Sequence, residues 1–485
     1  MNVNNCIIKI ITYTISIDWY NPYKVLDNGK STGSGFFIKD NYIITCAHVI
    51  DKASSILFTL PSSGRKTYEA VVVGICYDND IALLKPKKYI SNFNLIIADS
   101  DKVKVDDVVR AVGYPLSQDN PKSTKGIISG RQGTYLQTDA PINPGNSGGC
   151  LLNDKDEVIA INSAKISSDV AENIGFCIPI NDYKIIENDL KNSKNLIINK
   201  PNLVTDFTNT TDKLLEYLNI NKMDGYLIRK IYKTSPFYKS NIKKGDLLCY
   251  FDNYKIDSYG ECKTEWNDYK IHINDLLDRY PIGSSVLIKY ICVDESKNIQ
   301  IKDDKITFDN IDYYKLKIKY PPFEKIDYEI LGGLIFMDLT INHILNLENS
   351  QVSIKNILNL KNYVKRKKRF KNRIILTNIL GESSINKYNV LKKGDIIKRI
   401  NNIKVRTIED VRKALLKPII KNKNYYITIK TKDNNFFISD LNSILENESL
   451  VSKKYKYNLS VIHNKLKNIK NESKIVNKNY NIKII

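Results

Sequence analysis

The sequence predicts a mainly β protein of several domains, with an all-β sandwich or barrel in front and a repeated module behind it. A chain of 485 residues is too long for one ordinary core and corresponds to two to four domains of about 100–200 residues. Residues 33–180 consist of short β-branched runs separated by Gly, Asn, Asp and Pro, which is typical of β structure. The segment KKGD at 243–246 returns at 392–395, each time before an apolar strand, an Asn-rich turn and a helix-like stretch.

Composition and charge separate the front of the chain from the back. Hydrophobic residues make up 42% and aromatic residues 10%, which is enough apolar surface for packed cores and excludes wholesale disorder. The net charge of +21 is uneven, because residues 1–190 sum to −2 and residues 191–485 to +23. An excess of this size points to anionic partners or to charged faces on the back of the chain.

The eight cysteines lie mostly in apolar runs and form no C-x-x-C pair, so we expect reduced, buried thiols. No His/Cys cluster has zinc-ligand spacing, so we expect no metal and no cofactor. The apolar run 7–17 is broken by Lys9 and has the features of neither a secretory signal nor a transit peptide. No apolar stretch reaches the ~18–20 residues of a membrane span. We therefore expect a cytoplasmic protein without a membrane span.

Three short segments supply one candidate for each role in nucleophilic catalysis by serine: TCAH at 45–48, DIALL at 80–84 and NPGNSGG at 143–149. Such catalysis needs a nucleophile, an imidazole base and a carboxylate that orients the imidazole. His48, Asp80 and Ser147 fill these roles. Asp78 competes with Asp80, which we favour because the strand pattern resumes directly after it.

The serine segment also offers donors for the oxyanion of a tetrahedral intermediate. A sharp turn at Pro144 would bring the N–H groups of Gly145 and Ser147, with Asn146 between them, around one oxyanion position. Gly148 and Gly149 would remove side chains where a substrate backbone approaches.

Residues 31–190 resemble the chymotrypsin-like double β-barrel protease domain of the HtrA/DegP family. The resemblance rests on segments in the family's order: TGSGFFI, YIITCAHVI, NDIALLK, VVRAVGYP, TKGIISG, LQTDAPINPGNSGG and ENIGFCIPI. It implies the triad His48, Asp80 and Ser147, and an oxyanion hole at Gly145, Asn146 and Ser147. It also puts Ser163 on the substrate-pairing strand, with Ile142 and Ile166 near an apolar specificity pocket.

The repeated modules resemble the PDZ-like α+β domains that follow these proteases and capture peptides by strand addition. The second module, with GGLIF at 332–336 and about 40 residues inserted before its next strand, is similar to the degenerate second PDZ domain of the plant-type Deg branch. We predict helices at 267–278 and 408–416. The resemblance implies that the carboxylate-binding loop of the first module is formed by Gly225, Tyr226, Leu227 and Ile228.

The predicted organisation has six parts. They are an N-terminal segment 1–30, a trypsin-like serine protease domain 31–190, a linker 191–215, a PDZ-like domain 216–325, an atypical PDZ-like domain 326–445 with a basic insertion, and a basic tail 446–485 that we expect to be partly disordered. Family members trimerise through aromatic residues before the barrel. Trp19, Tyr20 and Tyr23 are therefore expected contacts of a trimer-based homo-oligomer.

The main hypothesis is an ATP-independent serine endopeptidase of HtrA/Deg type, acting on unfolded or regulatory proteins delivered by PDZ capture; a polyprotein processor is the competing substrate hypothesis. One alternative is a latent protease that serves as a peptide-binding or chaperone scaffold. Another is a basic nucleic-acid-associated protein that uses the run 361–373, whose central part 365–371 would also permit nuclear import. No nucleic-acid-binding fold surrounds that run, so nucleic acid is the minor alternative.

Overall fold

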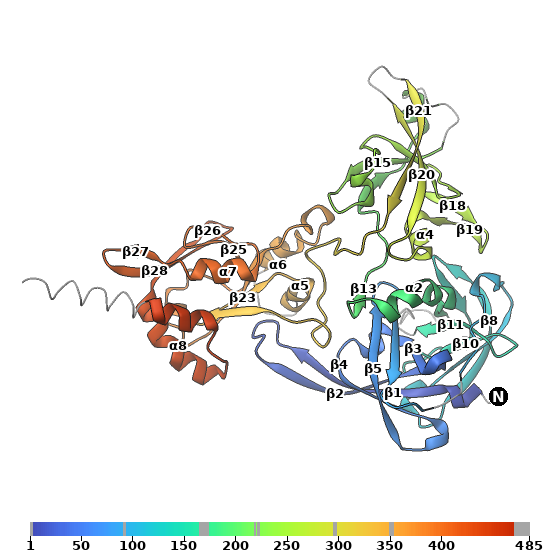
Figure 1. Ribbon diagram of the computed structural model, residues 1–485, viewed down its shortest axis with the longest axis horizontal. Helices are drawn as coiled ribbons and strands as arrows, with labels where there is room; N and C mark the ends of the chain where they lie inside the picture. Colours follow the sequence, from blue (N-terminus) through green and yellow to red (C-terminus); the bar gives the residue numbers. More distant parts are fainter. Residues whose placement is uncertain are drawn as a thin grey trace, which may run out of the picture. The chain divides into compact units, whose positions relative to one another are not determined.

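The computed structural model describes residues 3–469 except 91–93, 164–173, 218–219, 221–223, 294–297 and 349–353. The chain forms two compact units (Figure 1). Unit 1 comprises Met1–Thr14 and Asn28–Tyr313, and unit 2 comprises Ile15–Asp27 and Tyr314–Ile485. The predicted mainly β class, with two barrels in front, is confirmed.

The first barrel of unit 1 is a seven-stranded sheet in the order β13-β5-β4-β1-β2-β3-β6, which closes because β5 also pairs with β6. Phe36, Phe37 and Phe58 of this sheet are fully buried, and Phe37 meets Phe58 edge-on at 5.9 Å. The strands are β1 (Ile7–Ile17), β2 (Val25–Ile38), β3 (Tyr42–Cys46), β4 (Ala53–Thr59), β5 (Thr67–Cys76), β6 (Ile81–Pro86) and β13 (Ile197–Ile198).

The second barrel is closed in the order β10-β11-β12-β9-β8-β7. The helix α2 (Ile180–Asn192) follows it and buries Tyr183, Ile186 and Leu190. The strands are β7 (Val108–Gly113), β8 (Lys122–Gln132), β9 (Tyr135–Thr138), β10 (Cys150–Leu152), β11 (Val158–Ser163) and β12 (Gly175–Pro179).

The remainder of unit 1 is an α+β module on a sheet ordered β14-β15-β16-β20-β21, with β17 beside β16. The helix predicted at 267–278 is wrong in its first half. Residues 267–272 pair with 261–264 as a hairpin, and only 273–279 are helical. The elements are β14 (Thr205–Thr208), α3 (Asp212–Tyr217), β15 (Tyr226–Ile231), β16 (Leu247–Phe251), β17 (Tyr254–Lys255), β18 (Glu261–Thr264), β19 (Asn267–His272), α4 (Ile273–Leu276), β20 (Ser285–Val293) and β21 (Ile299–Thr307).

Unit 2 has a sheet in the order β22-β23-β24-β25-β28-β27, with β26 beside β25 and β29 beside β28. The helix predicted at 408–416 is confirmed as α7, which begins with a capping box between Thr407 and Asp410. The elements are β22 (Tyr328–Leu331), β23 (Leu334–Asp338), α5 (Ile341–Glu348), α6 (Ile354–Lys361), β24 (Ile374–Ile379), β25 (Ile396–Ile400), β26 (Ile403–Lys404), α7 (Ile408–Leu415), β27 (Ile419–Lys421), β28 (Asn424–Thr431), β29 (Phe436–Asp440) and α8 (Leu441–Tyr455).

The aromatic residues near the N-terminus are packed within unit 2 of the same chain, which differs from their expected role as oligomer contacts. Trp19 is 7% exposed and meets the ring of His343 edge-on at 5.1 Å. Tyr20 donates its hydroxyl to a backbone carbonyl of α5 at 2.9 Å, and Tyr23 packs on Tyr457. Trp19 is thus buried inside the unit, and Tyr20 and Tyr23 are partly buried in it, which leaves less apolar surface for an oligomer contact at this segment.

The basic tail predicted from residue 446 is ordered as far as residue 469. The helix α8 runs to Tyr455, and residues 461–469 are helical. Ile462 and Leu466 are 6% and 0% exposed and belong to the apolar core of unit 2. Their helical spacing of four residues places both on one face, a pattern hidden among the surrounding Lys and Asn residues. Residues 470–485 lie outside the described part of the chain.

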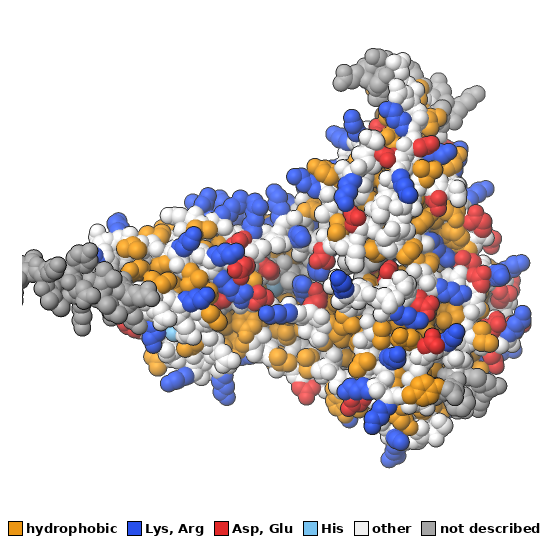
Figure 2. Space-filling model, in the orientation of Figure 1, with side chains coloured by type: hydrophobic (Ala, Val, Ile, Leu, Met, Phe, Trp, Pro, Cys, Tyr) orange, Lys and Arg blue, Asp and Glu red, His pale blue; other side chains and the backbone are white. Residues whose placement is uncertain are grey.

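The basic run 365–371 contributes internal contacts to unit 2. Arg366 donates to the hydroxyl of Tyr314 at 3.1 Å, and Arg369 donates to the carbonyl of Leu316 at 3.2 Å and stacks on Tyr314. On the face shown in Figure 2, Lys and Arg side chains occur on both units, with acidic side chains interspersed. The arginines of the run therefore hold the insertion in place, an arrangement that does not favour a nucleic-acid surface.

A buried carboxylate makes the stability of unit 1 depend on pH. Asp182 in α2 is 3% exposed, and its Oδ1 has no hydrogen-bond partner among the described residues. Burial raises the pKa of Asp182 to about 7, against about 3.9 in an unfolded chain. The folded state therefore holds a proton that the unfolded state loses, and stability falls as the pH rises from about 4 to 7.

We predict that Asp182→Asn leaves the melting temperature nearly unchanged at pH 4 and raises it at pH 8, because the amide carries no charge to bury. Thermal denaturation by circular dichroism at both pH values measures this. Asp154→Asn, an exposed carboxylate in the same barrel, is the matched control and should change neither value. An equal shift at both pH values would show that the charge of Asp182 is not the cause.

Candidate active site

His48 and Asp80 meet at the edge of the first barrel. His48 lies in the short helix α1 (Ala47–Ile50) directly after β3, and Asp80 directly precedes β6. The antiparallel pairing of β3 with β6 sets Cys46 opposite Ile81, which brings these two chain ends together. The backbone of Asp80 has φ 55°. Residues other than Gly rarely adopt this left-handed conformation, and Asp tolerates it better than most of them.

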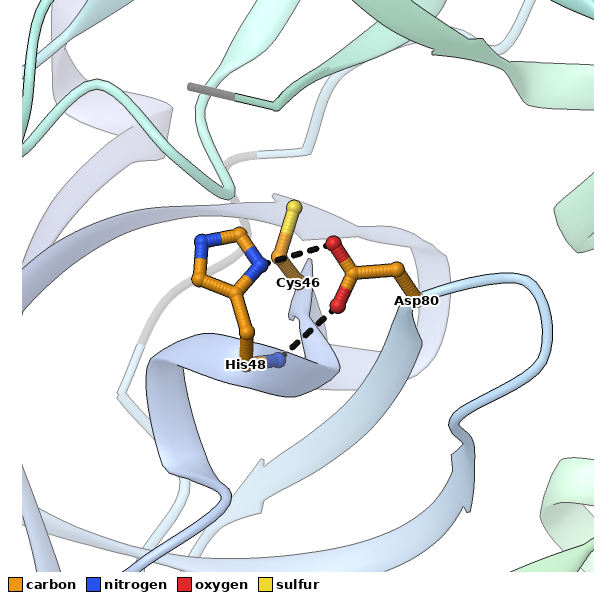
Figure 3. Close-up of side chains that lie close together, drawn as sticks. All are labelled: Cys46, His48 and Asp80. Carbon is orange, nitrogen blue, oxygen red and sulfur yellow. Dashed lines mark hydrogen bonds and ion pairs between the residues drawn. The ribbon is translucent and has the colours of Figure 1, made fainter. Parts of the chain in front are cut away.

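Both carboxylate oxygens of Asp80 accept hydrogen bonds from His48 (Figure 3). Oδ2 lies 2.7 Å from the ring Nδ1, and Oδ1 lies 2.9 Å from the backbone nitrogen. The carboxylate can only accept, so Nδ1 carries the proton and Nε2 presents a lone pair. The side chains of His48 and Asp80 are 22% and 13% exposed, so the pair is largely shielded from water.

The competing carboxylate, Asp78, points elsewhere. Its Oδ2 accepts from the backbone N–H of Lys200 at 3.3 Å. Ser163, at the end of β11, lies beside Asp80 instead and donates its hydroxyl to Oδ2 at 3.4 Å. Ser163 was expected on the substrate-pairing strand, and the structure adds a role for its hydroxyl in fixing the carboxylate.

The loop that carries Ser147 is tied by its backbone to strands of both barrels. The carbonyl of Ser147 accepts from the N–H of Ser34 in β2 at 2.8 Å. The next N–H, of Gly148, donates to the carbonyl of Asn162 in β11 at 2.9 Å. A side chain at Gly148 would lie 3.0 Å from the nitrogen of Cys46, two residues before His48. The serine loop therefore packs against the strand end that positions the imidazole.

The turn before Ser147 is fixed from inside the protein. Gly145 has φ 98°, and its carbonyl accepts from the hydroxyl of Ser34 at 2.7 Å. The N–H of Asn146 donates to the carbonyl of Asn143 at 2.9 Å, so it is engaged within the turn. This differs from the inclusion of Asn146 in the expected oxyanion hole, and the candidate donors are the N–H groups of Gly145 and Ser147.

The two glycines after Ser147 serve packing rather than substrate approach, which corrects their predicted role. A Cβ at Gly148 would lie 2.2 Å from Oγ1 of Thr45 and 2.3 Å from the carbonyl of Ser34. A Cβ at Gly149 would lie 2.2 Å from the carbonyl of Val112. Both positions need glycine because backbone from other strands occupies the space of a side chain.

Of the two predicted pocket residues, the structure describes one. Ile142 is 9% exposed and belongs to the apolar core of the second barrel, where it packs closely on Gly175 at the start of β12. Ile166 lies outside the described residues.

The predicted carboxylate-binding loop of the first PDZ-like module leads into an inner strand. β15 pairs with β14 on one side and with β16 on the other. A peptide can add only to an unpaired strand edge, so this arrangement contradicts strand addition there. The residues affected are Gly225, Tyr226, Leu227 and Ile228.

β14 is one of the two outer strands of that sheet, β21 being the other, and the backbone before β14 has an unusual conformation. Val204, directly before β14, has φ 48°, which is rare for a β-branched residue. Its N–H is held by the side chain of Asn202 at 2.8 Å. Strained backbone of this kind is concentrated at functional sites. The sequence directly before β14 contains no glycine, so it did not indicate a left-handed backbone at Val204.

In unit 2 the corresponding edge is covered by the chain itself. β22 turns through Gly332 and Gly333, with φ 63° and 73°, and pairs with the outer edge of β23. Arg412 of α7 holds β22 by a bidentate bond to Asp327 at 2.7 and 2.8 Å and by a bond to Glu329 at 2.9 Å. The hydrogen bond from Arg412 lowers the pKa of Asp327 below its usual range. GGLIF therefore forms the turn and the start of the second strand of a hairpin. The first strand of this hairpin, β22, occupies the edge to which a peptide would add.

The packing of Gly148 gives a stability prediction. Gly148→Ala should destabilise unit 1 by several kcal/mol, because the new methyl group meets Thr45 and Ser34 in addition to the ~1–2 kcal/mol cost of a left-handed backbone. Gly29→Ala is the matched control, since Gly29 has the same φ of 83° and nothing within 4 Å of its Cβ. Urea denaturation of both variants measures the difference. Equal losses would contradict the packing role of Gly148.

Comparison with protein families matches two parts of the chain. Residues 33–161 match the trypsin-like peptidase domain, and residues 321–460 match a PDZ domain. The first match contains His48, Asp80 and Ser147, and the second covers most of the sheet of unit 2 together with α7 and α8.

Among curated relatives, a probable periplasmic serine endoprotease DegP-like from Buchnera aphidicola subsp. Baizongia pistaciae is 35% identical over 284 residues, which span 56% of this chain and 59% of the relative. The serine protease Do-like HtrA of Bacillus subtilis is 31% identical and is covered over 65% of its length. A DegP-like endoprotease of Rickettsia prowazekii is 29% identical, with 84% of this chain and 75% of the relative aligned. The chain thus spans 59–75% of the length of these relatives.

The expected cytoplasmic location, with nuclear import as its variant, is contradicted by these names. Relatives from Buchnera and Pseudomonas putida are named periplasmic endoproteases, which points to an extracytoplasmic compartment. Within the described residues, no helix is both long and apolar enough to cross a membrane.

The fold has a counterpart among solved structures. A variant of the HtrA-type protease AlgW, solved with a decapeptide, superposes with a TM-score of 0.50 at 21% identity over 63% of this chain and 94% of that one. Together, the family matches, the curated relatives, the two barrels and the PDZ domain support one assignment: the chain is similar to the HtrA/DegP family of serine proteases.

Proposed function

We propose that the chain is an ATP-independent serine endopeptidase of the HtrA/DegP type. The observation that carries the proposal is the double hydrogen bond from His48 to Asp80, next to a serine loop bound to the same strand end. Relatives named serine endoproteases support the same activity.

In the proposed reaction Ser147 Oγ attacks the scissile carbonyl while its proton passes to Nε2 of His48. Asp80 keeps the imidazole in the tautomer that can accept this proton and stabilises the imidazolium that forms. The oxyanion receives hydrogen bonds from the N–H groups of Gly145 and Ser147. The proton on Nε2 then passes to the leaving amine, and a water molecule repeats the sequence to release the acyl group.

We expect substrates in which aliphatic side chains have become accessible, as in unfolded proteins. The family resemblance places an apolar specificity pocket near Ile142 and Ile166, and hydrophobic pockets discriminate by only ~1–3 kcal/mol per methylene. Exposure of a cleavable segment would then decide which protein is cut.

The nucleophile is tested with a fluorophosphonate probe and with casein. The wild-type chain should be labelled and should cleave casein, whereas Ser147→Ala should lose the label and nearly all cleavage. Ser63→Ala, in a surface turn of the first barrel, is the control. Equal labelling of Ser147→Ala and wild type would contradict the assignment, and cleavage retained by Ser147→Ala would point to another nucleophile.

Asp80→Asn should lower kcat by about 10⁴, because an amide can present its N–H to Nδ1 and so favour the wrong imidazole tautomer. Asp78→Asn should leave kcat within about twofold. Steady-state cleavage of a chromogenic peptide measures both variants. A large loss for Asp78→Asn with little loss for Asp80→Asn would reverse the choice between the two carboxylates.

We further propose that the first PDZ-like module captures peptide C-termini along β14. The supporting features are the outer position of β14 and the left-handed Val204 before it. A fluorescent apolar peptide with a free carboxylate should bind to the Ser147→Ala chain, and its C-terminal amide should bind at least ~10-fold more weakly. A photoreactive version should crosslink within 201–208. Crosslinks confined to 225–228 would contradict this proposal.

A trimer-based homo-oligomer remains a prediction. The packing of Trp19 and Tyr23 inside the chain argues that other surfaces would form the contacts. Light scattering coupled to size exclusion measures the assembly directly.

A further inference from the structure

A third potential metal ligand lies beside the His48–Asp80 pair. Cys46, the last residue of β3, points toward the pair in Figure 3. Its Sγ, a ring nitrogen of His48 and a carboxylate oxygen of Asp80 all lie within 4.8 Å of one another. The thiol is fully buried and donates to the carbonyl of Asn162 at 3.3 Å. A sulfur, an imidazole nitrogen and a carboxylate oxygen thus form one cluster of potential metal ligands.

These three donors are the ligand types that Zn²⁺ prefers. Zinc takes thiolate sulfur at about 2.3 Å and nitrogen or oxygen at about 2.0–2.2 Å in a tetrahedron, which corresponds to ligand atoms ~3.5 Å apart. The nitrogen and oxygen of His48 and Asp80 are 2.7 Å apart, and no pair in the cluster exceeds 4.8 Å. Adjustments of about 1 Å would therefore complete three corners, and water would occupy the fourth. Magnesium and calcium prefer oxygen alone, so the sulfur selects against them.

We propose that Cys46, His48 and Asp80 form an inhibitory zinc site built into the catalytic pair. Zinc binds Sγ of Cys46, Nδ1 of His48 and a carboxylate oxygen of Asp80. The binding site stands on the geometry of the cluster, and its inhibitory effect rests on the proposed protease function.

The proton balance explains the inhibition. The thiol of Cys46 loses its proton to solvent as the zinc–sulfur bond forms. Nδ1 of His48 gives its lone pair to zinc, and the proton that it carried moves to Nε2, so the imidazole stays neutral. Nothing is oxidised or reduced, and one proton is released for each zinc bound. With Nε2 protonated, His48 cannot accept the proton of Ser147, and Asp80 no longer orients the ring.

No metal was expected from the sequence, because the donors do not follow a zinc motif. Cys46 and His48 are separated by one residue, and Asp80 follows 32 residues after His48. Only the pairing of β3 with β6 brings the third donor to the other two.

Cobalt(II) binding tests the site without any need for activity. The full wild-type chain should bind one Co²⁺ with the near-ultraviolet thiolate-to-cobalt band and the strong visible bands of tetrahedral coordination, and zinc should displace it. Cys46→Ala should lose the thiolate band, while Cys262→Ala, which removes a buried thiol from the first PDZ-like module, should keep it. Circular dichroism establishes that each variant is folded. No thiolate band in wild type, or the same band in Cys46→Ala, overturns the site.

Inhibition is measured separately, relative to the zinc-free rate of each protein. Zinc should inhibit peptide cleavage by wild type and Cys262→Ala, with recovery on adding a chelator. Cys46→Ala should need at least ~10-fold more zinc for half inhibition, since it lacks one ligand. The same inhibition constant in wild type and Cys46→Ala, or cobalt binding without inhibition, would refute the inhibitory role. If the chain binds cobalt but never cleaves peptide, the proposed protease function is contradicted and the metal site is still supported.

Discussion

The contact between α1 and the turn before β6 in unit 1 is organised around the carboxylate of Asp80. This carboxylate accepts hydrogen bonds from the ring N–H and the backbone N–H of His48. The backbone carbonyl of Asp80 accepts a further hydrogen bond from the N–H of Ala47 at 3.0 Å. These bonds join the start of α1 to the turn before β6 and fix the tautomer of the imidazole at the same time. A partly buried carboxylate is costly unless its oxygens are satisfied, and here the hydroxyl of Ser163 adds a third donor. The chemistry and the local fold therefore depend on one group.

Strand edges decide which parts of the back of the chain can meet a peptide. β15 is paired on both sides, β23 is covered by β22, and β14 ends its sheet. The two related modules therefore differ in whether the corresponding strand edge is free or covered. In unit 2 the ion pairs of Arg412 with Asp327 and Glu329 hold the covering strand in place. We infer that substrate capture belongs to the first module and that the hairpin of the second serves the stability of its own unit.

Part of the positive charge of the back of the chain has a structural role. Arg366 and Arg369 donate to the hydroxyl of Tyr314 and the carbonyl of Leu316, which precede the second module, and Arg373 donates to the carbonyl of Lys368 within the insertion. Arginine suits this role because its planar group stacks on tyrosine while it donates several hydrogen bonds. A run that resembles a nuclear localisation signal in the sequence thus holds a loop together in the fold.

The sequence by itself determined the β class, the two related modules and the three catalytic candidates, because these depend on short-range patterns: β-branched runs, a repeated KKGD turn and residues placed next to strand ends. The tertiary structure alone decided which side chains meet. It placed Asp80, which the sequence already favoured, and not Asp78 beside His48, and it gave Gly148 and Gly149 their packing role, because these outcomes depend on strands distant in sequence. The N–H of Asn146 is engaged within its own turn. The tertiary structure also paired both sides of β15, buried Trp19 within unit 2 and brought Cys46 to the His48–Asp80 pair. Strand order and register are long-range properties, so no local pattern in the sequence encodes these contacts.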